Sequence, residues 1–561
     1  MSINRSQTER INSIFKGNSF VIPTYQRKYS WTDEERKELW QDIQESINDD
    51  MNHFVGTICL KENKTVDLSS TETVYEIIDG QQRIITIFIL LSVLIDSIKD
   101  TKVKEIQRNA FIGSDNNLKI QPLGGDGEFL KSIIFNYDKI DVAQVKKRSQ
   151  ILMYSAKKEY LAFVKPLSSE EIEQTIIFIL NKIELLVSNV ESQAQAVKMF
   201  SIINDRGLPL RILDKTKSIL MLYSTMHLKE RLNPIINDSF EIIFDSYDDI
   251  FLLKDKLGIL GGFEENTIFT QHYYSAKTLF PETWHYKDSA DTIFKNLKSK
   301  CQDSKNNKDE LETFILNYVV DLANFAANYS SLIKEIENKI IYQKPFRFLG
   351  YTATLYPLII RLYSQKKLDE LLAVLELTEV RVFKLTGTNA IKDIYLLSSE
   401  VAFSNLDIEE IKQRLIEFNQ KFMPDFNFKN FLGTDIATNR AVKYIVSEYN
   451  NDQLSINQYN NLQVEHIFSV DPEFEPSSYG FVEGYDYEKD RIGNLGLLEE
   501  NINKGIGNKP PIHKVNGYLK SIVENTRNLA GEIQKGNYSK TNVDERRERI
   551  IEFCIDRFKL S

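Results

Sequence analysis

An adjacent carboxylate and imidazole near the C-terminus are the residues of this chain best suited to chemistry. Glu465 and His466 stand together in LQVEHIF, and Asn494 follows in RIGNLGLL. An imidazole can accept a proton from water near neutral pH. Carboxylate and amide oxygens are ligands that a hard cation such as Mg²⁺ prefers. Together they suit hydrolysis of a phosphodiester, which needs an activated water and a cation beside the leaving oxygen.

The sequence around these residues predicts a strand, a loop, a second strand and a helix. The alternation of apolar and polar residues before His466 predicts a strand that ends there, and an acidic loop, 470–490, follows. We expect a second strand at 491–498 and a helix from Glu499. This order is the layout of a ββα-metal (HNH-type) nuclease. In this layout, an asparagine of the helix supplies an oxygen ligand to the metal. Asn494 hydrogen-bonds either the imidazole or a nearby backbone group. The expected helix carries Asn501, Asn503, Lys504 and Asn508.

A second polar cluster lies near the N-terminus. The stretch YEIIDGQQRIIT, 75–86, predicts a strand, a tight turn and an apolar helix whose first N–H groups, with Arg83, can hold a phosphate. Upstream, IPTYQRKYSW, 22–31, offers aromatic rings that can stack on a base. In the same stretch, Arg27 can bind phosphate bidentately. The alternative is a buried polar network that only joins the first helix to the sheet. The candidate ligand-binding residues are Tyr25, Gln26, Arg27, Asp79, Gly80, Gln81, Gln82, Arg83 and Thr86.

These two N-terminal motifs resemble the N-terminal domain of the GmrSD-type restriction enzymes and their relatives, including SspE-like and BrxU-like phage-defence proteins. A third stretch, MFSIINDRGLPL at 199–210 followed by Asp214, is similar to the family's F-x-x-x-N-x-R-G-x-P-L-x-x-x-D signature. The resemblance implies a ParB/sulfiredoxin-like α/β core that senses a nucleotide or modified DNA. It also implies that a latch or part of the nucleotide pocket is formed by Asn204, Arg206, Gly207 and Asp214.

The C-terminal residues resemble the nuclease domain of the same family, whose pattern is E/D-H-I-x-P, G-N-L-x-L-L and N-x-x-x-x-N-x-x-F-x-x-K. The match implies that His466 is the general base and Asn494 an orienting residue. It makes Glu465 and Asn503 the metal ligands. Supporting positions, toward substrate phosphate, are implied for Asn508 and Lys514.

Two departures from this pattern matter. Ser469 replaces the usual proline, which loosens the turn after the histidine without removing a catalytic group. His513 is a rival for the last position of the HNH motif. We prefer Asn503, because it falls on the first turns of the expected helix.

Composition limits the broad class of protein. The chain has 561 residues with 42% apolar and 27% charged residues, as in ordinary soluble proteins of several domains. No apolar run reaches the length of about 18 residues that spans a bilayer, and the N-terminus lacks the features of a secretory signal. Three distant cysteines predict reduced thiols. We therefore expect a cytoplasmic protein without a membrane partner.

Charge and motifs exclude two simpler functions. The net charge of −10 argues against a protein that coats DNA, although a local basic groove can still steer a polyanion. No Walker A motif (GxxxxGK[ST]) occurs, so a P-loop ATPase is excluded. Hydrolysis of a nucleoside triphosphate, with GTP, ATP or CTP as candidates, would use the N-terminal pocket.

The prediction is a mostly helical α+β multidomain protein. It comprises a ParB/sulfiredoxin-like sensing domain with a helical extension at 1–225, a helical coupling region at 226–405 and an HNH-type nuclease at 406–561. The predicted function is a type IV-like restriction endonuclease acting on phage or modified DNA, dependent on Mg²⁺ or Mn²⁺ and gated by the N-terminal domain. A homo-oligomer is compatible with the sequence. Two alternatives are an RNase or suicidal toxin with the same site, and a nucleotide-binding regulator with a catalytically weak nuclease domain.

Overall fold

The structure is a computed structural model that describes residues 7–22, 26–63, 73–115, 117–122, 125–145, 147–190, 211–387, 390–450 and 453–560. It is a mostly helical α+β protein, which confirms the predicted fold class. The chain divides into two compact units. One comprises 1–252, 264–269 and 289–330, and the other 253–263, 270–288 and 331–561. Among the described residues, no helix is long and apolar enough to cross a membrane.

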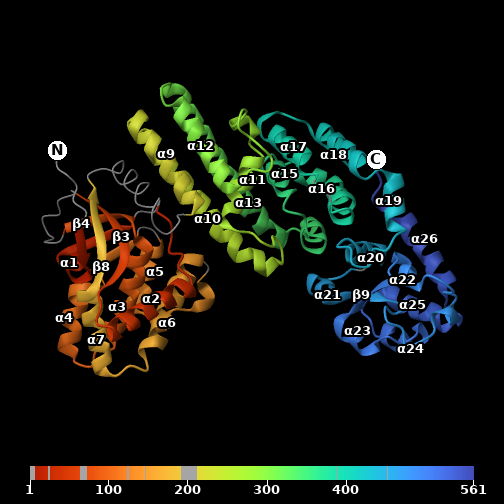
Figure 1. The fold of residues 1–561 in the computed structure, drawn as a ribbon, viewed down its shortest axis with the longest axis horizontal. Coiled ribbons are helices and arrows are strands. Elements are labelled where there is room, and N and C mark those ends of the chain that lie inside the picture. Colours follow the sequence, from red (N-terminus) through yellow and green to blue (C-terminus); the bar gives the residue numbers. More distant parts are fainter. Residues whose placement is uncertain are drawn as a thin grey trace. The chain divides into compact units, whose positions relative to one another are not determined.

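The N-terminal unit contains a six-stranded mixed sheet in the order β1-β8-β3-β4-β2-β7. Strands β3, β4 and β8 of this sheet are labelled in Figure 1. Its strands are β1 (Gln7–Arg10), β2 (Asn18–Ile22), β3 (His53–Glu62), β4 (Thr73–Asp79), β7 (Ile120–Pro122) and β8 (Ile183–Val190). Strand β2 runs parallel to both β4 and β7. The carboxyl ends of these three strands therefore meet at one edge of the sheet, which is where α/β folds commonly place ligands.

Helix α3 (Gln81–Asp96) is the core of this unit. Its sequence is apolar on nearly every side, and residues 84–95 are all buried. It packs against α4, α6 and α7. The helices around the sheet are α1 (Ile11–Phe15), α2 (Asp33–Asn48), α4 (Thr101–Phe111), α5 (Gly125–Phe135), α6 (Arg148–Val164) and α7 (Ser169–Lys182). Smaller elements are the β5 (Gly113–Ser114) and β6 (Asn117–Leu118) hairpin, η1 (Tyr137–Lys139) and η2 (Val142–Gln144).

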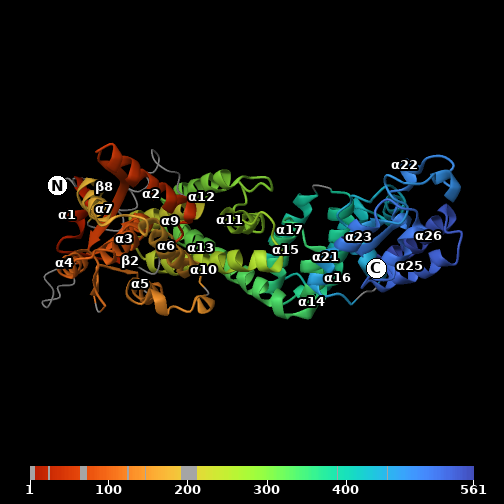
Figure 2. The same ribbon diagram turned by 90° about the horizontal axis from the view of Figure 1, so that it is seen from below.

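The middle of the chain is helical, as predicted from its periodicity. Within the N-terminal unit, α9 (Ile212–Leu228) lies beside α12 (Ala290–Ser304), as Figures 1 and 2 show. The other long helices are α10 (Asn233–Leu257), α11 (Glu265–Tyr274), α13 (Lys308–Asn338), α15 (Tyr356–Ser364), α16 (Leu368–Thr378), α17 (Ile391–Phe403), α18 (Ile408–Phe422) and α19 (Asp425–Leu432). Shorter helical pieces are η3 (Lys277–Leu279), α14 (Ile340–Gln343), η4 (Lys344–Leu349) and η5 (Glu379–Leu385).

The C-terminal end of the second unit contains a two-stranded antiparallel sheet of β9 (Leu462–His466) and β10 (Leu495–Glu499). His466 lies opposite Leu495, and α23 (Glu500–Ile506) follows β10 directly. This is the strand, loop, strand and helix order expected from the sequence. The surrounding elements are α20 (Val442–Asn450), α21 (Ile456–Asn461), η6 (Pro476–Tyr479), α22 (Tyr485–Glu488), η7 (Ile492–Asn494), α24 (Pro511–Tyr518), α25 (Glu524–Gln534) and α26 (Lys540–Arg557).

Two predicted boundaries in this region were wrong. The second strand begins at Leu495 and not at Arg491, because residues 492–494 form a tight helical turn. The helix that carries Asn503 ends at Ile506, before Asn508, because Gly507 has a φ of +60° that leaves the helical region. The sequence also predicts a helix at 191–203, which lies outside the described residues.

Candidate functional site

The imidazole of His466 is hydrogen-bonded to an acidic residue that the sequence did not single out. His466 Nε2 lies 2.7 Å from Oδ1 of Asp490, 24 residues further along the chain. Both side chains are about one-fifth exposed, so the pair is reachable from solvent. Asp490 is the last residue of the acidic loop. That position, just before RIGN, was the only sequence signal that could have indicated it.

Asn494 joins the two segments that carry this pair. Its Nδ2 donates to the carbonyls of Phe468, at 2.8 Å, and of Lys489, at 2.7 Å. Its Oδ1 accepts the N–H of Phe468 at 2.8 Å. A side-chain amide has both donors and an acceptor, which this position requires. Of the two contacts left open by the sequence, imidazole or nearby backbone, the structure shows the backbone one.

Helix α26 holds the turn that presents Asn494. Arg546 is buried, and its Nη1 donates to the carbonyls of Gly493 at 2.8 Å and Leu495 at 2.7 Å. An added Cβ on Gly493 would lie 2.2 Å from the carbonyl oxygen of Val543, so the helix packs directly on the glycine backbone. The close packing of Gly493 and the hydrogen bonds of Arg546 therefore both hold the turn against α26.

The side chain of Glu465 is buried against helix α24. Its Oε1 accepts from Lys514 Nζ at 2.8 Å and from the Tyr518 hydroxyl at 2.9 Å. Lys514 is 1% exposed and also donates to the carbonyl of His466. Burial lowers the pKa of Lys514, and the charge of Glu465 partly offsets this lowering. Lys514 thus supports Glu465, and its buried ammonium does not have the exposure that a phosphate contact needs.

Asn503 lies on α23 and reaches the same face of β9. Its Nδ2 donates to Oε1 of Gln463 at 3.3 Å, and Gln463 shares the strand face of Glu465, two residues on. Asn508 lies in the turn after α23, and its carbonyl accepts from Glu473 N at 3.1 Å. Over the described part of the chain, no group of three His, Cys, Asp or Glu residues forms a metal site. A cation here would therefore depend on one carboxylate, amide oxygens and water, which is a donor set that suits Mg²⁺.

In the N-terminal unit, the two predicted motifs lie side by side and are joined by hydrogen bonds. Gln82 Oε1 accepts from Ser30 N at 2.8 Å, and its Nε2 donates to the carbonyl of Lys28 at 3.0 Å. The hydroxyls of Thr86 and Tyr29 are 2.9 Å apart. Gln26 Nε2 donates to the carbonyl of Ile78 at 3.0 Å. These contacts match the alternative of a polar network that joins helix and sheet.

Arg27 links this network to helix α9 and to α11. Its Nη1 lies 3.3 Å from Oδ2 of Asp214 and 3.1 Å from Oε1 of Glu265. Glu265 also accepts from Arg211 at 2.8 Å. Burial alone would lower the pKa of Arg27, but the two carboxylates raise it above its usual value. Arg27 is therefore engaged by protein acids. Four further predicted residues, Tyr25, Asn204, Arg206 and Gly207, lie outside the described residues.

The turn between β4 and α3 is shaped by Gly80. Its φ is +92°, and an added Cβ would lie 3.0 Å from the carbonyl oxygen of Thr57. Arg83 Nη1 donates to the same oxygen at 3.1 Å. Gln81, the first residue of α3, is buried. Burial raises the pKa of Asp79 to about 6, although the charge of Arg83 acts in the opposite direction.

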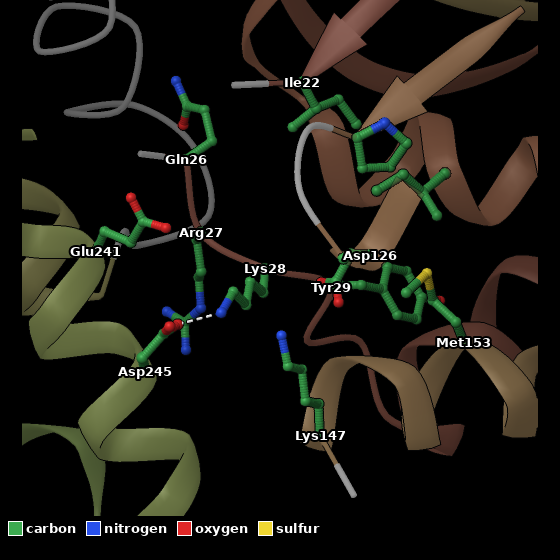
Figure 3. A pocket seen from close by; sticks show the side chains of 13 residues that line it. Ile22, Gln26, Arg27, Lys28, Tyr29, Asp126, Lys147, Met153, Glu241 and Asp245 are labelled. Carbon is green, nitrogen blue, oxygen red and sulfur yellow. Dashed lines mark hydrogen bonds and ion pairs between the residues drawn. The ribbon is translucent and has the colours of Figure 1, made fainter. Parts of the chain in front are cut away.

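A cavity of about 130 Å³ opens beside this network, at the carboxyl ends of β2 and β7 (Figure 3). Of the predicted residues that the structure describes, Gln26 and Arg27 line it. Lys28 forms an ion pair with Asp245 at its wall. Asp126 is buried, and its Oδ1 has no hydrogen-bond partner in the described structure. The cavity also takes in Tyr29, Ile85, Lys147, Met153 and Glu241.

The two regions with candidate sites correspond to the two domains of a restriction endonuclease. Residues 11–221 match the family model of the GmrSD restriction endonuclease N-terminal domain, and residues 417–553 match that of the GmrSD restriction endonuclease C-terminal domain. The chain therefore belongs to the GmrSD restriction endonuclease family. No curated protein matches it.

The raised pKa of Asp79 predicts a pH-dependent stability. Its pKa rises from 3.8 to about 6 on folding, so its destabilising effect grows as the pH rises through that window and is complete above it. Asp79→Asn should therefore stabilise the N-terminal unit at pH 8, by up to about 3 kcal/mol, and lose this effect at pH 4. Thermal unfolding at the two pH values measures it. The exposed Asp138→Asn is the control, and an equal gain at pH 4 would contradict the assignment.

The clamp of Asn494 predicts a large loss of stability in the C-terminal unit. Asn494→Ala leaves one N–H and two carbonyls of buried backbone without their partner, which should cost roughly 2–4 kcal/mol. Denaturant unfolding followed by a probe in this unit measures the loss. Asn516→Ala, at an exposed position of α24, should change stability little. Equal effects of the two substitutions would show that Asn494 is not a clamp.

Proposed function

We propose that this family member is a phage-defence, type IV-like restriction enzyme that cuts DNA with a metal-dependent HNH-type site in its C-terminal unit, gated by its N-terminal domain. The observation that carries the proposal is the arrangement around β9. The imidazole of His466 ends the strand, Asn494 fixes the backbone beyond it, and Asn503 stands on the helix that follows the second strand. The family's restriction activity supports DNA as the substrate.

In the proposed reaction, His466 takes a proton from a water molecule. The water oxygen forms a bond to phosphorus while the bond from phosphorus to the 3′ oxygen breaks, and the leaving oxygen takes a proton from solvent. Glu465 and Asn503 would hold the divalent cation, Mg²⁺ or Mn²⁺. When bound, the cation neutralises charge on the phosphate and the leaving oxygen. Asn494 contributes by holding the backbone of Phe468, two residues after His466.

We further propose that the N-terminal cavity binds the gating ligand, a nucleoside triphosphate (GTP, ATP or CTP) or a modified base. Its position at the carboxyl ends of β2 and β7 supports this proposal. Lys147 offers a positive charge, and the unpartnered Oδ1 of Asp126 can accept from a ligand hydroxyl or amino group. Asp79 and Arg83 then act from the neighbouring turn by fixing the start of α3.

Removal of His466 tests the nuclease assignment. His466→Ala should lower plasmid nicking in Mg²⁺ or Mn²⁺ by about 10²- to 10⁴-fold, because the general base is lost. The exposed His513→Ala should retain activity, since His513 is the rival that we did not choose. Nicking of plasmid and modified phage DNA by gel assay measures both. If His466→Ala nicks DNA at the wild-type rate, the site assignment is wrong. Stronger cleavage of total RNA than of DNA by the wild-type protein would favour the RNase alternative.

Substitution of Lys147 tests the gating pocket. Lys147→Ala should weaken nucleotide binding about tenfold or more, because a charge-assisted contact to phosphate is lost. Calorimetry with GTP, ATP and CTP measures the affinity, and Lys139→Ala, on η1 and outside the cavity lining, is the control. Nicking without nucleotide should be unchanged in both variants. Unaltered affinity of Lys147→Ala for every nucleotide would remove the cavity from the proposal.

A further inference from the structure

We infer that Asp490 is a positioning residue for His466, that it fixes the protonated nitrogen of the imidazole at Nε2, and that Nδ1 is the nitrogen that accepts the proton from water. This inference rests on the proposed nuclease function. It begins from the 2.7 Å contact between His466 Nε2 and Asp490 Oδ1, which connects the end of β9 to the end of the acidic loop.

The backbone of Asp490 is held on both sides of the residue. Its carbonyl accepts from the N–H groups of Ile436 and Ala437, each at 3.1 Å. The preceding carbonyl, of Lys489, accepts from Asn494 at 2.7 Å. Since Asn494 also binds both backbone groups of Phe468, one buried amide sets the spacing between the histidine segment and the aspartate segment. The contact between the two side chains is thus built into the fold.

Neighbouring acids of the same loop have a different kind of partner. Asp486 pairs with Lys489 three residues away, and its side chain is 86% exposed. Such an exposed local pair contributes little and needs no fixed geometry. Glu488 is less exposed, and its partners are the cations Arg491, Lys540 and Arg547. Asp490, in contrast, meets an imidazole on another element, and both members are about four-fifths buried. The imidazole partner therefore separates Asp490 from the other two acids.

The chemistry of the two groups determines where the proton lies. An ionised carboxylate only accepts hydrogen bonds, and a neutral imidazole has one N–H. The 2.7 Å contact therefore places that N–H on Nε2 and leaves the lone pair on Nδ1. When Nδ1 takes the proton of water, Nε2 keeps its own, and the carboxylate of Asp490 stabilises the resulting imidazolium. Hydroxide then forms its bond to phosphorus, as in the proposed reaction.

Kinetics of the full-length protein test this role. Asp490→Asn should lower kcat for nicking of a defined duplex at least about tenfold with KM within about twofold, because the imidazole is no longer oriented. Asp490→Glu should recover part of the rate. Combined with His466→Ala, Asp490→Asn should lower the residual rate no further, since Asp490 acts through His466. The matched control is Asp486→Asn, in the same loop and 86% exposed, which should leave kcat unchanged.

Nitrogen NMR provides a readout that a structural role would not move. In protein labelled with ¹⁵N-histidine, the signals of His466, identified by their loss in His466→Ala, should show a protonated Nε2 and an unprotonated Nδ1. Asp490→Asn should shift the ring toward a mixture of the two forms. The wild-type spectrum alone decides the tautomer if the variant does not fold.

The outcomes separate the two proposals. Wild-type nicking by His466→Ala would overturn the proposed function, while the NMR signature would still report the contact. Loss of nicking in His466→Ala together with wild-type kcat in Asp490→Asn would overturn only the role of Asp490. A proton on Nδ1 in the wild-type protein, or an additive loss in the double variant, would also overturn it.

Discussion

The C-terminal site depends on one buried side-chain amide. The side chain of Asn494 makes three hydrogen bonds, and they connect the chain just after His466 to the chain just before Asp490. Each bond contributes only about 1 kcal/mol on its own, but an unpaired buried group costs more than that. The position therefore accepts a side-chain amide and little else. Gly493 packs tightly on α26, and Arg546 binds the carbonyls on either side of Asn494. These contacts keep the amide in place.

The sequence indicated the elements of this site well and its contacts less well. The strand at 462–466 and the helix that carries Asn503 follow from alternation and apolar periodicity, which are local properties. Asp490 was missed because its partner lies 24 residues away and, apart from its place just before RIGN, nothing local distinguishes it from the other acids of the loop. The start of β10 was misplaced for a similar reason, since the turn at 492–494 is imposed by Arg546 from a distant helix.

In the N-terminal unit, polar residues that looked like ligand contacts mainly bind one another. Gln82 and Thr86 use their hydrogen bonds on residues 28–30, and Arg27 is surrounded by Asp214 and Glu265. Residue type and motif alone cannot distinguish such a network from a pocket, because both need buried polar groups with partners. A network and a pocket do differ in whether each buried polar atom has a hydrogen-bond partner. Asp126, which none of the family motifs contained, has an oxygen without a hydrogen-bond partner, whereas Gln82 has both of its amide atoms bonded.

In both candidate ligand sites, a charged side chain forms ion pairs with groups of opposite charge. Glu465 is neutralised by Lys514, and Arg27 by two carboxylates. A buried ion pair gains little stability over apolar packing, but removal of one partner leaves a costly uncompensated charge. In the proposed site, a cation at Glu465 would have to share the carboxylate with Lys514, and the hydrogen bonds from Lys514 and Tyr518 both fall on Oε1. The second oxygen of Glu465 would therefore be the atom that could hold a metal without displacing the lysine, and the carboxylate would stay compensated both with and without the metal.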